Sequence, residues 1–239
     1  MPSRLQAAEQ LLGDVREIRC IVQHAGEDVP GLFYLPRETD SPLPLVLIQH
    51  PATSSKDDYF VRDIAMSWAK RGWICGGIDA PLHGDRTEHD PMRVFRDREV
   101  MQQVSAQFAG EVTAVIDALA EYLPVNLDRI AYVGYSMGSM LGIRAVAEDG
   151  RFKAAAFCLI GEGGIVGNVA ANDSWVRRLG TVAIRIVGKT EDEVIPRAAT
   201  EALYEALAGI KDMLWLPGGH FQIGPDVVNA AGAWLLAQL

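Results

Sequence analysis

The sequence predicts an α/β fold, a mostly parallel, twisted sheet of about eight strands with helices on both faces. Two observations lead to this prediction. Short apolar runs alternate along the chain with longer segments of helical period, which is typical of β-to-α units. The composition, 49% hydrophobic and 22% charged over 239 residues, is that of a protein with a large buried core. The strands of such a sheet are buried on both faces and are expected to be apolar throughout.

The first pair of strands is expected to be antiparallel. After a short helical lead, residues 17–23 and 29–35 show the alternation of half-buried strands. The turn-forming residues 25–28 lie between them. A connection this short is typical of antiparallel neighbours.

The rest of the chain is predicted to alternate strands and helices. Each strand candidate is short and apolar, and a segment of helical period or a loop with one short helix follows it. The expected pairs are 43–49 with 57–70, 73–78 with 97–122, 129–135 with 137–147, 154–160 with a short segment near Trp175, 182–187 with 196–208, and 213–216 with 225–239. In such a sheet the ligand site lies beyond the carboxyl ends of the strands.

We expect residues 1–239 to form a single domain, since α/β proteins of this length commonly build one core around one sheet. Two longer connections, at about 81–98 and 161–180, are expected to add small cap elements. The sequence leaves the oligomeric state open.

Charge and cysteine usage limit the partners and the compartment. The net charge of −9 argues against nucleic acid and anionic membrane surfaces as partners. Residues 1–19 never assemble the apolar run of a secretion signal, and no stretch approaches the length of a membrane span. Cys20, Cys75 and Cys158 are widely spaced in apolar contexts, as expected of buried reduced thiols. A cytoplasmic location is therefore expected.

A candidate nucleophile lies between a strand and a helix. Gly134-Tyr135-Ser136-Met137-Gly138 follows the apolar run 130–133 and precedes a helical segment. Glycines at both ends let backbones pass closely around a sharp turn, which pushes the serine out of the sheet. The pattern alone is weak, and a glycine-rich turn that packs a helix on a sheet would also produce it. The strand-turn-helix context favours Ser136 as a nucleophile.

A candidate base and its acid follow in later loops. His220 comes after the apolar run 213–216 and Pro217-Gly218-Gly219, directly before the last helix. A histidine base works best when a carboxylate fixes its tautomer and stabilises the imidazolium. One strand earlier, three adjacent carboxylates precede a helix, and they are Glu191, Asp192 and Glu193. Glu193 is expected to face solvent.

The order Ser136, Asp192, His220 resembles that of the α/β-hydrolase superfamily, in which nucleophile, acid and histidine occur in this sequence. The resemblance covers nearly the whole chain. The small carboxylesterase and dienelactone-hydrolase-like branches are the most similar in size, although the latter usually has cysteine where this chain has Ser136. What the resemblance implies is a serine hydrolase on an α/β-hydrolase architecture.

The spacing around the acid departs from the superfamily's pattern. Its members often place the acid three residues after a strand-ending glycine and four before a proline. Asp192 satisfies the spacing to Pro196 but lies four residues after Gly188, whereas Glu191 satisfies the glycine spacing. Asp192 is the preferred acid, and Glu191 is the alternative.

An oxyanion hole needs two N–H donors. The resemblance implies that Met137, the residue after the nucleophile, supplies one and that the loop at residues 49–55 supplies the other. That loop resembles the superfamily's His-Gly loop, but Pro51 stands in place of glycine and has no N–H. Ala52 is therefore the expected donor, with Thr53 in reserve.

The remaining histidines are expected to be structural or exposed. His50 is interpreted as a scaffold residue, and His83 lies in a turn that resembles the superfamily's Asp-x-Pro-Gly-His-Gly turn. His83, Asp85, His89 and Asp90 are residue types that suit zinc, but their spacing matches no common ligand pattern. We expect no metal site and no cofactor.

The predicted activity is the hydrolysis of small carboxylic esters through an acyl-enzyme at Ser136. Thioesters and amides pass through the same intermediate, and an alcohol can replace water as the acyl acceptor, so the sequence does not separate these reactions. A non-catalytic ligand-binding module on the same fold is a further alternative. Such modules commonly lack a triad residue, whereas this chain has all three.

Overall fold

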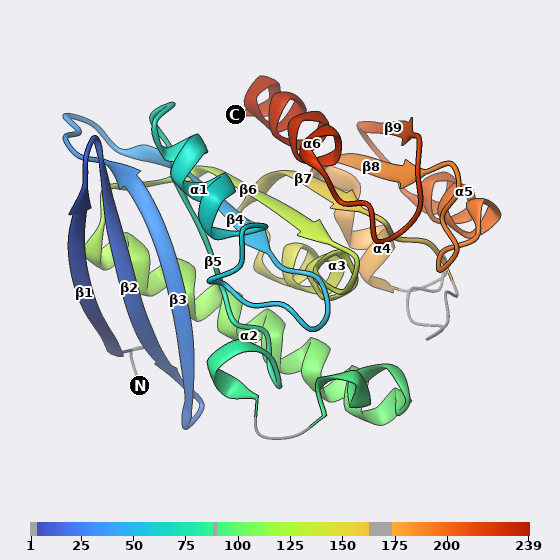
Figure 1. Cartoon of the computed structure of the whole chain (residues 1–239), viewed down its shortest axis with the longest axis horizontal. Coiled ribbons are helices and arrows are strands. Elements are labelled where there is room, and N and C mark those ends of the chain that lie inside the picture. Colours follow the sequence, from blue (N-terminus) through green and yellow to red (C-terminus); the bar gives the residue numbers. More distant parts are fainter. Residues whose placement is uncertain (1–3, 88–89, 163–173) are drawn as a thin grey trace.

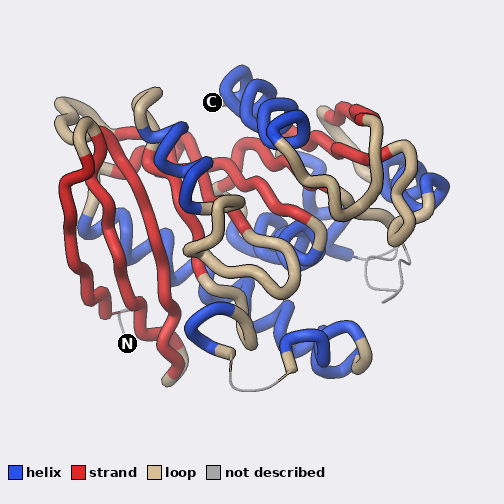
Figure 2. Tube along the Cα trace, viewed as in Figure 1, coloured by secondary structure: helices blue, strands red, loops and turns tan. Residues whose placement is uncertain are grey.

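The computed structural model describes residues 4–87, 90–162 and 174–239 and contains one nine-stranded sheet (Figure 1; Figure 2). The strand order is β1-β2-β3-β5-β4-β6-β7-β8-β9. The strands are β1 (Arg4–Leu12), β2 (Val15–His24), β3 (Glu27–Pro36), β4 (Leu43–Gln49), β5 (Ile74–Ile78), β6 (Val125–Tyr135), β7 (Phe152–Cys158), β8 (Ala183–Lys189) and β9 (Lys211–Leu216). The pairings from β5 to β9 are parallel, and the β1–β2, β2–β3 and β3–β5 pairings are antiparallel. The predicted α/β class and mostly parallel sheet are confirmed.

Helices cover both faces of the sheet (Figure 1). They are α1 (Arg62–Ala69), α2 (Arg98–Tyr122), α3 (Met137–Asp149), α4 (Ser174–Arg178), α5 (Arg197–Ala206) and α6 (Pro225–Gln238). Short 3₁₀ segments are η1 (Gly84–Arg86), η2 (Pro91–Phe95) and η3 (Leu179–Thr181). Residues of α2, α3 and α5 pack on one face, and those of α1 and α6 pack on the other.

Alternate residues of β4 show why the central strands are largely apolar. Leu45 and Leu47 belong to the core on the α2 and α3 face, whereas Val46 and Ile48 belong to the core on the α1 and α6 face. Successive side chains of a strand point to opposite faces, so a strand covered by helices on both sides favours apolar residues at every position.

The N-terminal prediction was wrong. The expected helical lead is strand β1, which pairs along its length with β2 and raises the number of strands to nine instead of about eight. The two strands meet at Gly13 and Asp14, and Gly13 takes the left-handed conformation that a two-residue hairpin turn needs. β1 is an edge strand and mostly exposed, so its sequence lacks the alternation that signals a strand.

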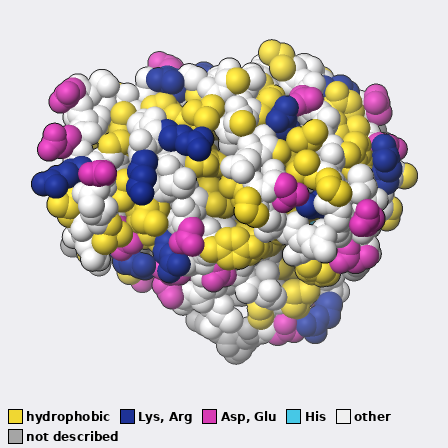
Figure 3. Space-filling model, turned by 45° about the horizontal axis from the view of Figure 1, so that its top comes forward, with side chains coloured by type: hydrophobic (Ala, Val, Ile, Leu, Met, Phe, Trp, Pro, Cys, Tyr) yellow, Lys and Arg dark blue, Asp and Glu magenta, His cyan; other side chains and the backbone are white. Residues whose placement is uncertain are grey.

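The surface mixes charges of both signs. Figure 3 shows Lys and Arg side chains interspersed with Asp and Glu on the face in view. Cys20, Cys75 and Cys158 are buried and free. Among the helices that the structure describes, none combines the length and the apolar composition that crossing a bilayer requires.

Candidate active site

Ser136 lies in the turn between β6 and α3, in a strained backbone conformation. Its φ is 50° and its ψ is −112°, a region that residues with a side chain rarely adopt. The Ser136 N–H donates to the carbonyl of Cys158 at the end of β7, 2.9 Å away. The surrounding structure thus holds the strained turn, and the serine precedes the first residue of α3 at the carboxyl end of β6.

Gly134 and Gly138 make the close backbone approach that the turn requires. A Cβ at Gly134 would lie 2.5 Å from the carbonyl group of Gly138, and a Cβ at Gly138 would lie 2.5 Å from the carbonyl oxygen of Gln49. Neither distance can be tolerated without a backbone shift. These contacts supply the steric reason for glycine at both positions, and they bring α3 against the loop that follows β4.

The structure brings the side chains of Ser136, His220 and Asp192 together. Ser136 Oγ lies 2.8 Å from His220 Nε2. On the other side of the ring, His220 Nδ1 lies 3.0 Å from Asp192 Oδ2 and 3.1 Å from Asp192 Oδ1. The side chains of His220 and Asp192 are only 5% and 4% exposed. Three residues far apart in sequence therefore form one hydrogen-bonded row at the carboxyl ends of β6, β8 and β9.

Asp192 is held as an ionised acceptor. Burial raises the pKa of its carboxyl, but hydrogen bonds from His220 and from the backbone N–H groups of Ile195 and Val194 outweigh burial, so the pKa lies below its ordinary value. Asp192 Oδ1 accepts these two backbone bonds at 2.7 and 2.9 Å. The carboxylate is thus fixed by its own turn before it meets the histidine.

The two neighbouring carboxylates have different surroundings. Glu191 is exposed, and its side chain accepts a weak bond from Thr190 at 3.4 Å. Glu193 is also exposed, but its Oε2 accepts the backbone N–H of His220 at 2.8 Å. The expectation that Glu193 only faces solvent therefore missed a contact with the histidine. Within the sequence no pattern indicates that Glu193 contacts the backbone of His220.

The candidate oxyanion donors belong to two different segments, the start of α3 and the loop after β4. Met137 is the first residue of α3, where a helix leaves its N–H groups without intrahelical acceptors. Ala52 is half-buried beside the core in the loop after β4. Thr53 is exposed and has a φ of 59°.

His50 ties the loop after β4 to the loop after β5. Its ring is buried, Nε2 accepts the N–H of Ala80 at 3.1 Å, and Nδ1 lies 2.8 Å from the carbonyl oxygen of Pro51. Because Ala80 donates to Nε2, the proton of the neutral ring lies on Nδ1. Burial lowers the pKa of His50 to about 4. Both ring nitrogens are thus used in holding the backbone.

A cluster of ion pairs around the buried Lys56 side chain joins the same two loops. The Lys56 ammonium lies 2.9 Å from Asp79, 2.6 Å from Asp85 and 2.9 Å from Asp57. Asp79 is fully buried and also accepts the backbone N–H groups of Lys56 and Asp85. Burial alone would lower the pKa of Lys56, but the hydrogen bonds to carboxylates raise it. The cluster fixes the loop that carries Ala52 and Thr53.

Lys56→Met is expected to lower the free energy of unfolding by about 3 kcal/mol, because it leaves the buried Asp79 carboxylate without its counter-charge. Urea denaturation with a fitted midpoint and slope measures the change. Lys70→Met is the matched control, since Lys70 is exposed at the end of α1. A loss below about 1 kcal/mol for Lys56→Met would contradict the anchoring role of the cluster.

The turn after β5 contains another histidine. His83 is buried, its Nδ1 lies 3.0 Å from the carbonyl oxygen of Pro81, and its Nε2 has no partner among the described residues. His89 lies outside the described residues. Among the residues that are described, no group of three or more His, Cys, Asp or Glu side chains is arranged to hold a metal ion.

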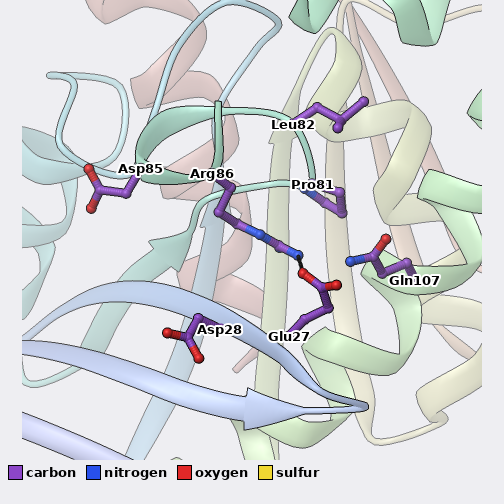
Figure 4. Close-up of a pocket in the computed structure, with 7 residues that line it drawn as sticks. All are labelled: Glu27, Asp28, Pro81, Leu82, Asp85, Arg86 and Gln107. Carbon is purple, nitrogen blue, oxygen red and sulfur yellow. Dashed lines mark ion pairs between the residues drawn. The ribbon is translucent and has the colours of Figure 1, made fainter. Parts of the chain in front are cut away.

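A hollow of about 390 Å³ lies beside this turn (Figure 4). Figure 4 shows Arg86 extending toward Glu27, and the two charged groups are 3.9 Å apart. Arg86 also forms two bonds of 2.7 Å with the buried Glu111 of α2. The hollow is lined by Glu27, Asp28, Pro81, Leu82, Asp85, Arg86 and Gln107. Its lining includes none of Ser136, His220 and Asp192, and Arg86 serves there as an ion-pair partner.

Comparison with known proteins agrees with this architecture. No family model matches the sequence. Esterase YjfP of Escherichia coli (strain K12) is 27% identical over 237 residues, which cover 85% of this chain and 93% of that protein. A cold-adapted esterase from an Arctic intertidal metagenomic library is 24% identical, with a TM-score of 0.83 and 97% of both chains covered. Acetyl xylan esterase from Paenibacillus sp. R4 is 18% identical, with a TM-score of 0.77 over 100% of this chain and 90% of that one.

These likenesses extend over nearly the whole chain. The chain is a homologue of Esterase YjfP and has the α/β-hydrolase fold.

Proposed function

We propose that this chain is a serine hydrolase that cleaves small carboxylic esters, with Ser136 as nucleophile, His220 as general base and Asp192 as the acid that orients it. The observation that carries the proposal is the continuous hydrogen-bonded row from Ser136 Oγ through His220 to Asp192. The homologue and the two related structures are all named esterases, which supports an ester as substrate.

The geometry suits acylation of the serine. His220 Nε2 accepts the Oγ proton as Oγ bonds to the ester carbonyl carbon, and the carbonyl oxygen becomes an oxyanion. The N–H groups of Met137 and Ala52 are the proposed donors to that oxyanion. Collapse of the intermediate breaks the bond to the alcohol oxygen, which takes the proton from His220. The acyl group then remains on Ser136.

Deacylation repeats the sequence with water. His220 removes a proton from a water molecule as the water oxygen attacks the acyl carbon. The proton passes to Ser136 Oγ when the carboxylic acid product leaves. Asp192 stabilises the imidazolium in both halves, and its low pKa keeps it ionised while it does so. Ser136 and His220 carry out these proton transfers together with the attacking water.

We also propose a cytoplasmic location, which the three buried free thiols support.

The described parts of the two expected cap segments are short. The first contains η1 and η2, in which Val94 is the buried residue, and the second contains α4, with five residues, and η3. Residues 88–89 and 163–173 of these segments lie outside the described residues. The first segment is rich in charge and offers little apolar area for a long acyl chain. These features support a small, open acyl site.

We expect hydrolysis of p-nitrophenyl esters, with kcat/KM falling at least about tenfold from acetyl or butyryl to dodecanoyl, because the described parts of the cap segments offer little apolar area to each additional methylene. Initial rates across a series of chain lengths measure this. Assays below and above the solubility limit of the ester are the control, and no jump in rate is expected when a separate oil phase forms. Absence of any hydrolysis would favour a non-catalytic module, and a preference for long chains would contradict the open site.

A further inference from the structure

Glu193 contacts the backbone of the proposed general base. Its Oε2 accepts the N–H of His220 at 2.8 Å, while the neighbouring Asp192 bonds to the ring of the same histidine. We propose that Glu193 is a positioning residue that fixes the main chain of His220, so that two adjacent carboxylates hold one histidine at two points. This inference rests on the proposed function, because it assigns Glu193 a part in the same site.

The bond between Glu193 and His220 extends the hydrogen bonds between β8 and β9 beyond the ends of the two strands. The β8–β9 ladder ends where Lys189 faces Leu216. Beyond it, the Thr190 N–H donates to the carbonyl of Leu216 at 2.9 Å, and the Glu191 N–H donates to the carbonyl of Gly218 at 3.1 Å. At His220 the acceptor is no longer a backbone carbonyl, because the N–H of His220 donates to the Glu193 carboxylate.

The loop before the histidine contains two adjacent glycines, Gly218 and Gly219. Gly218 has a φ of 103°, and glycine has more backbone freedom than any other residue. Gly219 makes room for the contact, since a Cβ there would lie 2.5 Å from Glu193 Oε2. Elsewhere the loop is held by Lys189, which donates to the carbonyl of Pro217 at 2.9 Å, and by the Gln222 side chain, which accepts the Gly219 N–H at 3.1 Å. The bond to Glu193 is the one that holds the N–H of His220 itself.

The turn that carries Glu193 is rigid in the required place. Asp192 Oδ1 accepts the N–H groups of Val194 and Ile195, which fixes the backbone on both sides of Glu193. The backbone from which the Glu193 side chain extends is thus held by the same hydrogen bonds that hold the Asp192 carboxylate. Because small misplacements of a reacting group reduce rates strongly, loss of this bond should act on turnover more than on binding.

Three variants test the role with p-nitrophenyl butyrate as substrate. Glu193→Ala is expected to lower kcat about tenfold with KM within about twofold, because the misplaced base affects the chemical step. Glu193→Gln keeps an acceptor oxygen and is expected to stay within about threefold of wild type. Glu191→Ala is the matched control, since Glu191 is exposed and has no contact with His220 among the described residues, and it should keep kcat within about twofold.

Amide hydrogen exchange at His220 reports on the bond without any substrate. We expect faster exchange in Glu193→Ala than in wild type or in Glu193→Gln. If wild type hydrolyses no ester, the proposed function fails while the exchange data still test the contact. If wild type is active and Glu193→Ala keeps its full kcat, the positioning role is wrong. It is also wrong if Glu193→Gln loses as much activity as Glu193→Ala.

Discussion

Ser136→Ala should lower ester turnover by at least about 10³- to 10⁴-fold, because the hydroxyl forms the covalent bond to the acyl group and the residual rate comes only from binding and the oxyanion hole. The strained turn is set by backbone contacts, in which the Ser136 N–H bonds to the carbonyl of Cys158. The Oγ bond to His220 is the side-chain contact that the substitution removes. The fold should therefore survive, and circular dichroism and the urea midpoint should match wild type.

Two measurements distinguish the loss of a covalent nucleophile in Ser136→Ala from a structural disturbance near residue 136. A fluorophosphonate probe should label wild type at the peptide that contains Ser136 and should leave Ser136→Ala unlabelled. The double variant with His220→Ala should be little worse than either single variant, because the two residues act as a unit. Ser41→Ala, at an exposed serine before β4, is the matched control. A Ser136→Ala protein that retains more than about a tenth of the wild-type rate would remove the serine from the proposed role.

The sequence was most informative where the fold is periodic or where a motif has a steric cause. The apolar run of β4 identifies a strand buried on both faces, as Leu45 and Val46 on opposite cores demonstrate. Gly134 and Gly138 are required by backbone approaches of 2.5 Å, so the turn between β6 and α3 leaves a sequence signature. His220 could be selected because it follows a strand candidate and two glycines directly before the last helix.

The sequence was less informative where partners are distant or the pattern is weak. β1 is an exposed edge strand, and only its pairing with β2 makes it a strand. Lys56 stands beside Asp57 in what reads as a solvated segment, yet it is buried because Asp79, 23 residues later, lies under it. Such contacts between distant segments are properties of the assembled fold and have no local pattern.

The sequence was least able to choose among the adjacent carboxylates at 191–193. The spacing to Pro196 favours Asp192 as the acid, whereas the spacing to Gly188 favours Glu191. The structure places Asp192 at 3.0 Å from His220 Nδ1 and leaves the Glu191 side chain exposed. Asp192 also accepts two backbone N–H bonds, a geometry that requires its short side chain at this position of the turn. We therefore expect the two carboxylates to differ sharply when each is made neutral.

Asp192→Asn should lower kcat by about 10² to 10⁴, and Glu191→Gln should change it less than about twofold. An amide can still accept the two backbone bonds, so the turn should remain, but it cannot stabilise the imidazolium and it permits the tautomer in which Nε2 carries the proton. That tautomer cannot accept the Ser136 proton. The pKa of Asp192 is already lowered, so wild type has an ionised partner for His220 throughout the neutral range.

The discriminating measurement is the pair of kcat values at one neutral pH, together with the rate of fluorophosphonate labelling at Ser136. Labelling depends on activation of the serine and not on product release, so Asp192→Asn should slow both by similar factors, whereas Glu191→Gln should slow neither. The reverse ranking would transfer the acid role to Glu191, against the observed 3.0 Å contact. Small effects in both variants would mean that His220 is oriented chiefly through its backbone, where Glu193 holds it.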